Sequence, residues 1–202
     1  MLQLIDKAVL SAMERQTLSA AYSAAFPLSE RRPEAQLFDE RPEGLRLLTL
    51  YDGETLVGML TLWSLSGVLF VEHFLTLEGY RNKGYGQQTL ERLKAESDCP
   101  LVLECEYPTN DLSTRRLGFY ERLGFVRQER PYYQPPYLAG AEPVPMYLLA
   151  TEHFVGEALE ALVSELYAQV YRHYPQETIV NDEKPYPAPN TPYGAMPSTD
   201  PR

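Results

Sequence analysis

Apolar and polar positions along the first 150 residues follow two periods, one typical of strands and one typical of helices. Alternating or continuous apolar runs predict strands at residues 2–5, 44–51, 55–63, 68–77, 101–107, 144–150 and from 124 onward. Apolar residues spaced three and four apart predict helices at 10–25, 84–97, 113–123 and 152–173, with a more polar helix at 29–39. The strand–helix–strand order over 68–107 predicts a right-handed crossover with two parallel strands. The pattern therefore indicates an α/β fold.

The C-terminal end departs from this pattern. Seven of the 17 prolines lie in residues 175–202, which predicts an extended arm rather than a second domain. We expect one domain over 1–150, a C-terminal helix over 151–174 and a proline-rich tail over 175–202. The inward positions of that helix are expected to be Val155, Leu159, Leu162, Leu166 and Val170. The helix and tail are suited either to covering the monomer or to contacting a second subunit, so a homodimer is one expectation.

Composition narrows the class of protein. A net charge of −10 argues against a nucleic-acid partner and is compatible with a cationic substrate, although it serves solubility equally well. Cys99 and Cys105 lack metal-site spacing and form no disulfide framework, which suits a reducing cytoplasm. Asp6 and Lys7 leave no secretory apolar core. The uncharged stretch 55–71 is interrupted by polar residues and predicts a buried hairpin rather than a membrane span.

A glycine-bearing turn, Arg81-Asn82-Lys83-Gly84-Tyr85-Gly86, joins the strand at 68–77 to the helix at 84–97. Glycine allows another molecule to approach the backbone closely, and a helix N-terminus attracts anions. Arg81 and Lys83 add positive charge, so a phosphate or pyrophosphate is the expected ligand. The pattern R-x-x-G-x-G is neither a P-loop nor a dinucleotide fingerprint. The alternative is a turn with a purely structural role.

A second motif, F-Y-x-x-x-G-F, begins at Phe119, 35 residues after Gly84. It lies on the helix predicted at 113–123, with Ser113 as the expected N-cap and Gly124 as the expected C-terminal glycine. Together, the two motifs resemble those of the GNAT (Gcn5-related) N-acetyltransferase family over roughly residues 44–150. Many members of that family carry Asn and Ala where this chain has Ser113 and Arg116.

The resemblance implies a mixed, mostly antiparallel central sheet with helices on both faces and a splay between two central parallel strands. Acetyl-CoA, the implied co-substrate, would lie in that splay. Its pyrophosphate would bind the N–H groups of 83–87, and its pantetheine arm would pair with the preceding strand. Tyr120 would protonate the leaving thiolate; the alternative is a core tyrosine. The implied cofactor-binding residues are Phe74, Leu75, Thr76, Arg81, Lys83, Gly84, Tyr85, Gly86 and Gln87.

Glu104 and Glu72 are the candidates for the group that accepts the proton of an attacking amine, and Glu106 is the candidate for binding the acceptor. Glu104 lies on the strand 101–107 and resembles a base used in ribosomal-protein alanine acetyltransferases. Glu106 points to the same face, and Glu72 lies on the facing strand of the splay. Alternatively, these carboxylates bind a cationic acceptor or are simply solvated. His73 is expected on the opposite face from Glu72, in the core.

The aromatic, proline-rich loop 131–137 is expected to wall the acceptor pocket through Tyr133. The sequence thus predicts a cytoplasmic acetyl-CoA-dependent N-acetyltransferase acting on a primary amine, without a metal, a membrane or nucleic acid. The alternative is a non-catalytic acyl-CoA-binding or regulatory domain. A third possibility, acetylation of aminoacyl-tRNA, is opposed by the acidic charge.

Overall fold

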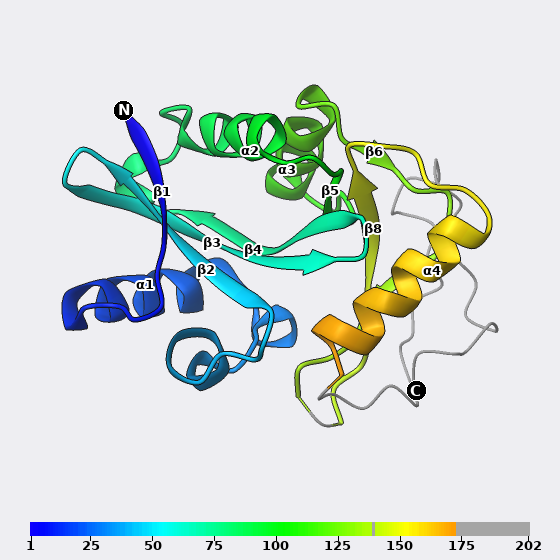
Figure 1. Cartoon of the computed structure of the whole chain (residues 1–202), viewed down its shortest axis with the longest axis horizontal. Coiled ribbons are helices and arrows are strands. Elements are labelled where there is room, and N and C mark those ends of the chain that lie inside the picture. Colours follow the sequence, from blue (N-terminus) through cyan, green and yellow to red (C-terminus); the bar gives the residue numbers. More distant parts are fainter. Residues whose placement is uncertain (139, 173–202) are drawn as a thin grey trace.

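The fold is built on one twisted sheet, seen in a computed structural model that describes residues 1–138 and 140–172 (Figure 1). Within these residues, eight strands join in the order β1-β2-β3-β4-β5-β8-β6, with β7 paired to β8. The strands are β1 (Leu2–Asp6), β2 (Leu45–Asp52), β3 (Thr55–Leu65), β4 (Val68–Thr76), β5 (Leu101–Glu106), β6 (Val126–Arg127), β7 (Tyr132–Gln134) and β8 (Val144–Ala150). All pairs are antiparallel except β4–β5, which is parallel. The expected mixed, mostly antiparallel sheet is therefore confirmed.

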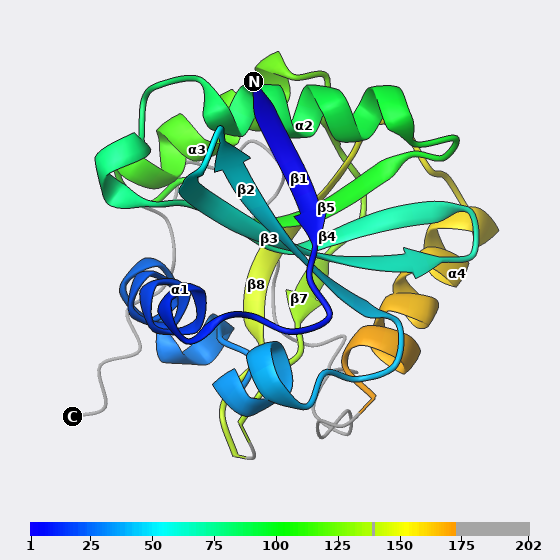
Figure 2. The ribbon, with the colours of Figure 1, turned by 60° about the vertical axis from the view of Figure 1, so that its left-hand side comes forward.

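Helices cover both faces of this sheet, each over its own apolar core (Figure 2). The helices are α1 (Ala12–Ala25), α2 (Tyr85–Glu96), α3 (Asp111–Arg122) and α4 (Glu157–Glu165), with 3-10 turns at Leu28–Glu30 and Glu78–Tyr80 and π-helical turns at Ala35–Asp39 (η2) and Leu166–Val170 (η4). The core under α2 and α3 contains Leu90 and Leu117. The core under α1, α4 and η4 contains Tyr22, Leu162 and Leu166.

The parallel strands β4 and β5 separate along their length. They pair from Leu69 opposite Leu101 to Val71 opposite Leu103. Beyond that point the described residues contain no further pairing between them, although β4 continues to Thr76 and β5 to Glu106. This is the predicted splay, and it leaves backbone groups on the facing edges of both strands free for a ligand.

A β-bulge in β4 reverses which side chains face which core. Leu62 pairs with Val71 and Thr61 with His73, so Glu72 is the extra residue. As a result Glu72 and His73 both lie on the α1 side of the sheet, where His73 Nε2 is 3.1 Å from the Tyr22 hydroxyl. The expectation that His73 faces away from Glu72 is wrong, because simple alternation does not survive a bulge. The expectation of a core position is correct, since His73 is buried.

Several boundaries also differ from the predicted ones. The polar helix expected at 29–39 is two short turns on either side of Pro33, which disfavours helical geometry at the residue before it. Ser113 is the third residue of α3, and the N-cap is Asn110; the two form a reciprocal capping box. The last helix begins at Glu157 rather than 152, so Val155 is exposed, while Leu159, Leu162, Leu166 and Val170 are buried as expected.

The tail predicted at 175–202 lies outside the described residues. Across 1–138 and 140–172, none of the helices combines the length and apolar character that crossing a bilayer requires. The same residues contain no group of three or more His, Cys, Asp or Glu side chains that could hold a metal ion.

Candidate active site

A cleft of about 640 Å³ opens where β4 and β5 diverge. It runs from the N-terminus of α2, past the ends of both strands, to the C-terminal end of α1 and the turn that follows it. Its lining includes Glu30, Phe74, Leu75, Thr76, Arg81, Gly84, Tyr85, Gly86, Gln87, Glu104, Glu106, Arg116, Phe119, Tyr120 and Gln134. The two sequence motifs therefore meet in one continuous space.

The loop before α2 has the backbone geometry that an anion site needs. Gly84 is the N-cap at φ +81°, a left-handed conformation that favours glycine, and no side chain caps the helix. The first N–H groups of the helix consequently lack intrahelical acceptors. A Cβ on Gly86 would lie 3.4 Å from Phe119 Cζ and 3.8 Å from Phe74. Glycine at this position thus keeps the space between the loop and the two rings open.

The residues predicted to bind the cofactor are nearly all on this part of the cleft wall. Of the nine, eight line it, and Lys83 is the exception. The Lys83 ammonium lies 5.0 Å from the centre of the Tyr80 ring, a cation–π contact at the edge of the loop. Arg81 Nε donates to the Thr76 carbonyl at 3.4 Å, which ties the loop to the end of β4.

Glu104 lies on β5 at the inner end of the cleft, where two tyrosine hydroxyls donate to its carboxylate. Tyr171 is 2.9 Å and 2.8 Å from the two oxygens, and Tyr132 donates to Oε1. Burial raises the pKa of Glu104 to about 7, although both hydrogen bonds act in the opposite direction and favour the anion. A carboxyl group with a pKa near neutrality exchanges protons readily at physiological pH.

Glu72 has a different environment, closed off by donors. Arg32 donates to Oε1 through Nε at 2.8 Å and Nη2 at 2.6 Å, and Tyr137 donates to the same oxygen at 2.9 Å. Trp63 Nε1 donates to Oε2 at 3.0 Å. Burial would raise the pKa of Glu72, but the Arg32 guanidinium holds it far below its usual range. Glu72 is thus the buried anion of an ion pair, with little capacity to accept a proton.

Glu106 lines the cleft two residues beyond Glu104 and pairs with Arg116 of α3. Glu30, from the turn after α1, faces the same region, and its burial raises its pKa, with the Glu106 charge contributing. Glu104, Glu106 and Glu30 give this end of the cleft an acidic character, which Arg116 partly offsets.

Tyr120 reaches the cleft from α3, between the loop and β5. Its side chain is 9% exposed, and burial raises its pKa further, so the phenol is fully protonated at neutral pH. Among the described residues nothing hydrogen-bonds the Tyr120 hydroxyl. The hydroxyl is therefore able to donate to a group that enters the cleft.

Tyr133 does not line the cleft. Neighbours on a strand point to opposite faces, and on β7 it is Tyr132 and Gln134 that are buried on the Glu104 side. Sequence reasoning assigned Tyr132 only to the loop expected to wall the acceptor pocket, and it assigned no role to Tyr171, Glu30 or Arg32. Proline-rich spacing was the only signal near Tyr132, and nothing in the sequence connects Arg32 or Tyr171 to a carboxylate.

The comparisons with known proteins agree with this geometry. The model of the "Acetyltransferase (GNAT) family" matches residues 15–125. A GNAT-family protein of Bacteroides thetaiotaomicron is 31% identical, with a TM-score of 0.74 over 85% of this chain and 98% of its own. No curated protein matches.

Two solved structures with lower identity share the fold. The ribosomal-protein-S18-alanine N-acetyltransferase of Escherichia coli is 16% identical, with a TM-score of 0.52 over 78% of this chain and 97% of its own. An aminoglycoside 6′-N-acetyltransferase complexed with coenzyme A is 15% identical, with a TM-score of 0.52 over 73% and 95%. At these identities the likeness concerns the fold alone.

Proposed function

We propose that this chain, which belongs to the GNAT acetyltransferase family, transfers an acetyl group from acetyl-CoA to a primary amine. The observation that carries the proposal is the continuity of the cleft. One end of the cleft is the N-terminus of α2, which follows Gly84 and has no side-chain cap. The other end contains Glu104, whose pKa is raised to about 7. A pyrophosphate suits the first end, and an amine that must lose a proton suits the second.

The cofactor end fits coenzyme A through backbone groups. The N–H groups of residues 84–87 and the Arg81 side chain would hold the pyrophosphate, and the open edge of β4 at 74–76 would pair with the pantetheine amides. An N–H on that edge would also stabilise the thioester oxygen as it gains negative charge. The space that Gly86 keeps open between Phe74 and Phe119 lies on the path between these groups.

Two side chains would move the protons of the reaction. Glu104 accepts a proton from the ammonium group of the acceptor. The neutral amine that results forms a bond to the acetyl carbon through its lone pair, and the carbon–sulfur bond breaks with its electron pair leaving on sulfur. Tyr120 donates its hydroxyl proton to the departing thiolate, for which a phenol that is fully protonated at neutral pH is suited. Glu106 and Glu30 would attract the cationic acceptor to the acidic end of the cleft.

Acetyl-CoA binding is tested by thermal unfolding of the full chain. A ligand at 100 times its dissociation constant stabilises a protein by about 2.7 kcal/mol, which raises the Tm of a chain of this size by roughly 5–10 °C. We expect that shift with acetyl-CoA and with CoA. No shift at millimolar acetyl-CoA would contradict the assignment of the loop. With binding established, thiol release measured against a panel of primary amines identifies the acceptor.

Tyr120→Phe separates an enzyme from a domain that only binds acyl-CoA. Losing a general acid should lower kcat by about 10²-fold or more, while the thermal shift with CoA stays within 1–2 °C of the wild-type shift, roughly 1 kcal/mol at most. Leu117→Met, on the same helix but buried outside the cleft lining, is the matched control for packing. A wild-type chain that binds acetyl-CoA but acetylates no amine would favour the non-catalytic alternative.

A further inference from the structure

The C-terminal segment that follows β8 reaches back to Glu104, a residue of the cleft wall, from the buried side. Tyr171, the residue after η4, is fully buried and donates to both oxygens of Glu104, at 2.9 Å and 2.8 Å. Tyr171 lies beyond residues 15–125, the part of the chain that the family model matches. Tyr132 also follows residue 125, so both hydroxyls on the Glu104 carboxylate are supplied from outside the matched region, and Tyr171 comes from the segment after β8.

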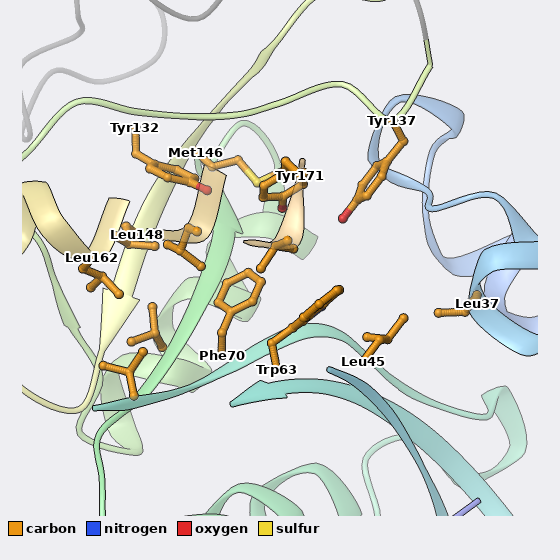
Figure 3. Close-up of a cluster of buried hydrophobic side chains, with 14 of the residues drawn as sticks. Leu37, Leu45, Trp63, Phe70, Tyr132, Tyr137, Met146, Leu148, Leu162 and Tyr171 are labelled. Carbon is orange, nitrogen blue, oxygen red and sulfur yellow. The ribbon is translucent and has the colours of Figure 1, made fainter. Parts of the chain in front are cut away.

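The segment is held in place by contacts of its own. Arg32 Nη2 donates to the Val170 carbonyl at 2.9 Å while it pairs with Glu72, so the turn that carries Tyr171 is anchored to the sheet. The Tyr171 ring packs against Tyr137, with centroids 5.4 Å apart. Figure 3 shows Tyr132, Tyr171 and Tyr137 in a row on one side of Phe70 and Trp63. The hydroxyl of Tyr171 thus has a fixed direction, toward β5.

We propose that Tyr171, together with Tyr132, is a positioning residue that fixes the Glu104 carboxylate in the cleft and favours its ionised form. The inference rests on the proposed function, in which Glu104 is the base. Two donors on one carboxylate restrict its rotation and stabilise its negative charge. The C-terminal segment is then a working part of the active site as well as a cover for the core.

The electrostatic surroundings of Glu104 come from several elements. Burial and the nearby charges of Glu72 on β4 and Glu30 in the turn after α1 raise its pKa, whereas the hydroxyls of Tyr132 on β7 and Tyr171 after η4 lower it. Tyr137 and Tyr167 also lie close enough to be affected by the charge of Glu104. The two hydrogen bonds therefore keep the pKa of Glu104 near 7, because they oppose the increase that burial causes.

Tyr171→Phe removes one donor without changing the volume of the ring. We expect the pKa of Glu104 to rise by about one unit, which is the size of effect expected for a hydrogen bond to a charged group. In a plot of kcat/KM against pH, the rising limb should move to higher pH by the same amount. Activity at pH 7 should fall about fivefold, while activity near pH 9 stays close to wild type.

Tyr167→Phe is the matched control, because Tyr167 lies one helical turn earlier and its hydroxyl donates to the Tyr133 carbonyl at 2.8 Å. This variant should leave the limb within about 0.3 units of wild type. If Tyr171→Phe lowers activity equally at all pH values, or if both variants shift the limb alike, the role of Tyr171 is structural and the proposal fails.

A measurement independent of turnover separates this proposal from the proposed function. Glutamate labelled with ¹³C at its carboxyl carbon reports the pKa of Glu104 directly, with the Glu104→Gln variant identifying its signal. An upward shift in Tyr171→Phe supports the positioning role even if no acceptor has been found. An unchanged pKa overturns it even if the wild-type chain acetylates amines.

Discussion

Replacing Glu104 with glutamine should lower kcat by about 10²- to 10⁴-fold, the usual contribution of a general base. Glutamine keeps the shape of the side chain and can still accept a hydrogen bond from a tyrosine, but it cannot take a proton at neutral pH. Because the α2 loop is untouched, the thermal shift with CoA should be unchanged. Steady-state thiol release and thermal unfolding measure the two quantities on the same preparations.

Glu106→Gln and Glu72→Gln distinguish the three glutamates. Glu106 already pairs with Arg116, so its loss should mainly raise the KM of a cationic acceptor. Glu72 is ion-paired with Arg32 in the core, so its loss should mainly lower stability. A Glu104→Gln variant with near wild-type kcat, beside a Glu106→Gln variant without activity, would transfer the role of base to Glu106.

Glu104→Gln should also change how the stability of the fold depends on pH, in a defined direction. The pKa of Glu104 is raised from 4.5 to about 7 on folding, so the native chain binds more protons than the unfolded chain between these values. Its contribution to stability is complete below pH 4.5 and is lost as the pH rises toward 7. Glu104→Gln lacks this loss, and its Tm relative to wild type should increase across that window.

Arg32→Ala should destabilise the fold by about 3–5 kcal/mol, the range observed when one member of a buried ion pair is removed. The Arg32 and Glu72 side chains are both 0% exposed, so truncation leaves an uncompensated carboxylate in the core. For a chain of this size the Tm should fall by roughly 6–20 °C. Urea unfolding followed by circular dichroism measures the free energy directly.

Arg46→Ala is the matched control for the loss of an arginine in an ion pair. Arg46 and Asp6 are 47% and 49% exposed, so its removal should cost less than about 1 kcal/mol. The double variant Arg32→Met/Glu72→Leu removes both buried charges and should recover much of the stability. If Arg32→Ala unfolds no more easily than Arg46→Ala, the buried pair does not stabilise this core.

What the sequence predicted correctly depends on local rules. The R-x-x-G-x-G turn requires glycine conformations that few other residues adopt, and Gly84 at φ +81° satisfies that requirement. Strand positions followed from apolar runs, and the parallel crossover over 68–107 followed from the order of elements. The placement of Glu104 and Glu106 on one face of β5 followed from the two-residue period of a strand.

What the sequence did not predict depends on contacts between distant residues. The bulge at Glu72 is a mismatch between two strands, and the sequence of β4 alone carries no sign of it. Arg32 meets Glu72 across 40 residues, and Tyr171 meets Glu104 across 67. Such pairs are determined by how the elements pack against one another. The local sequences around Arg32 and Tyr171 therefore do not indicate which residues they contact.

The contact between Tyr171 and Glu104 also sets an order of events during synthesis. Strand β5, with its carboxylate, leaves the ribosome well before η4 and the tyrosine that follows it. A nascent chain that ends within β8 has every strand of the sheet begun, yet it still lacks this donor to Glu104. On the proposed mechanism, Glu104 therefore gains its second tyrosine donor only when the C-terminal segment docks, after the strands of the sheet have been made.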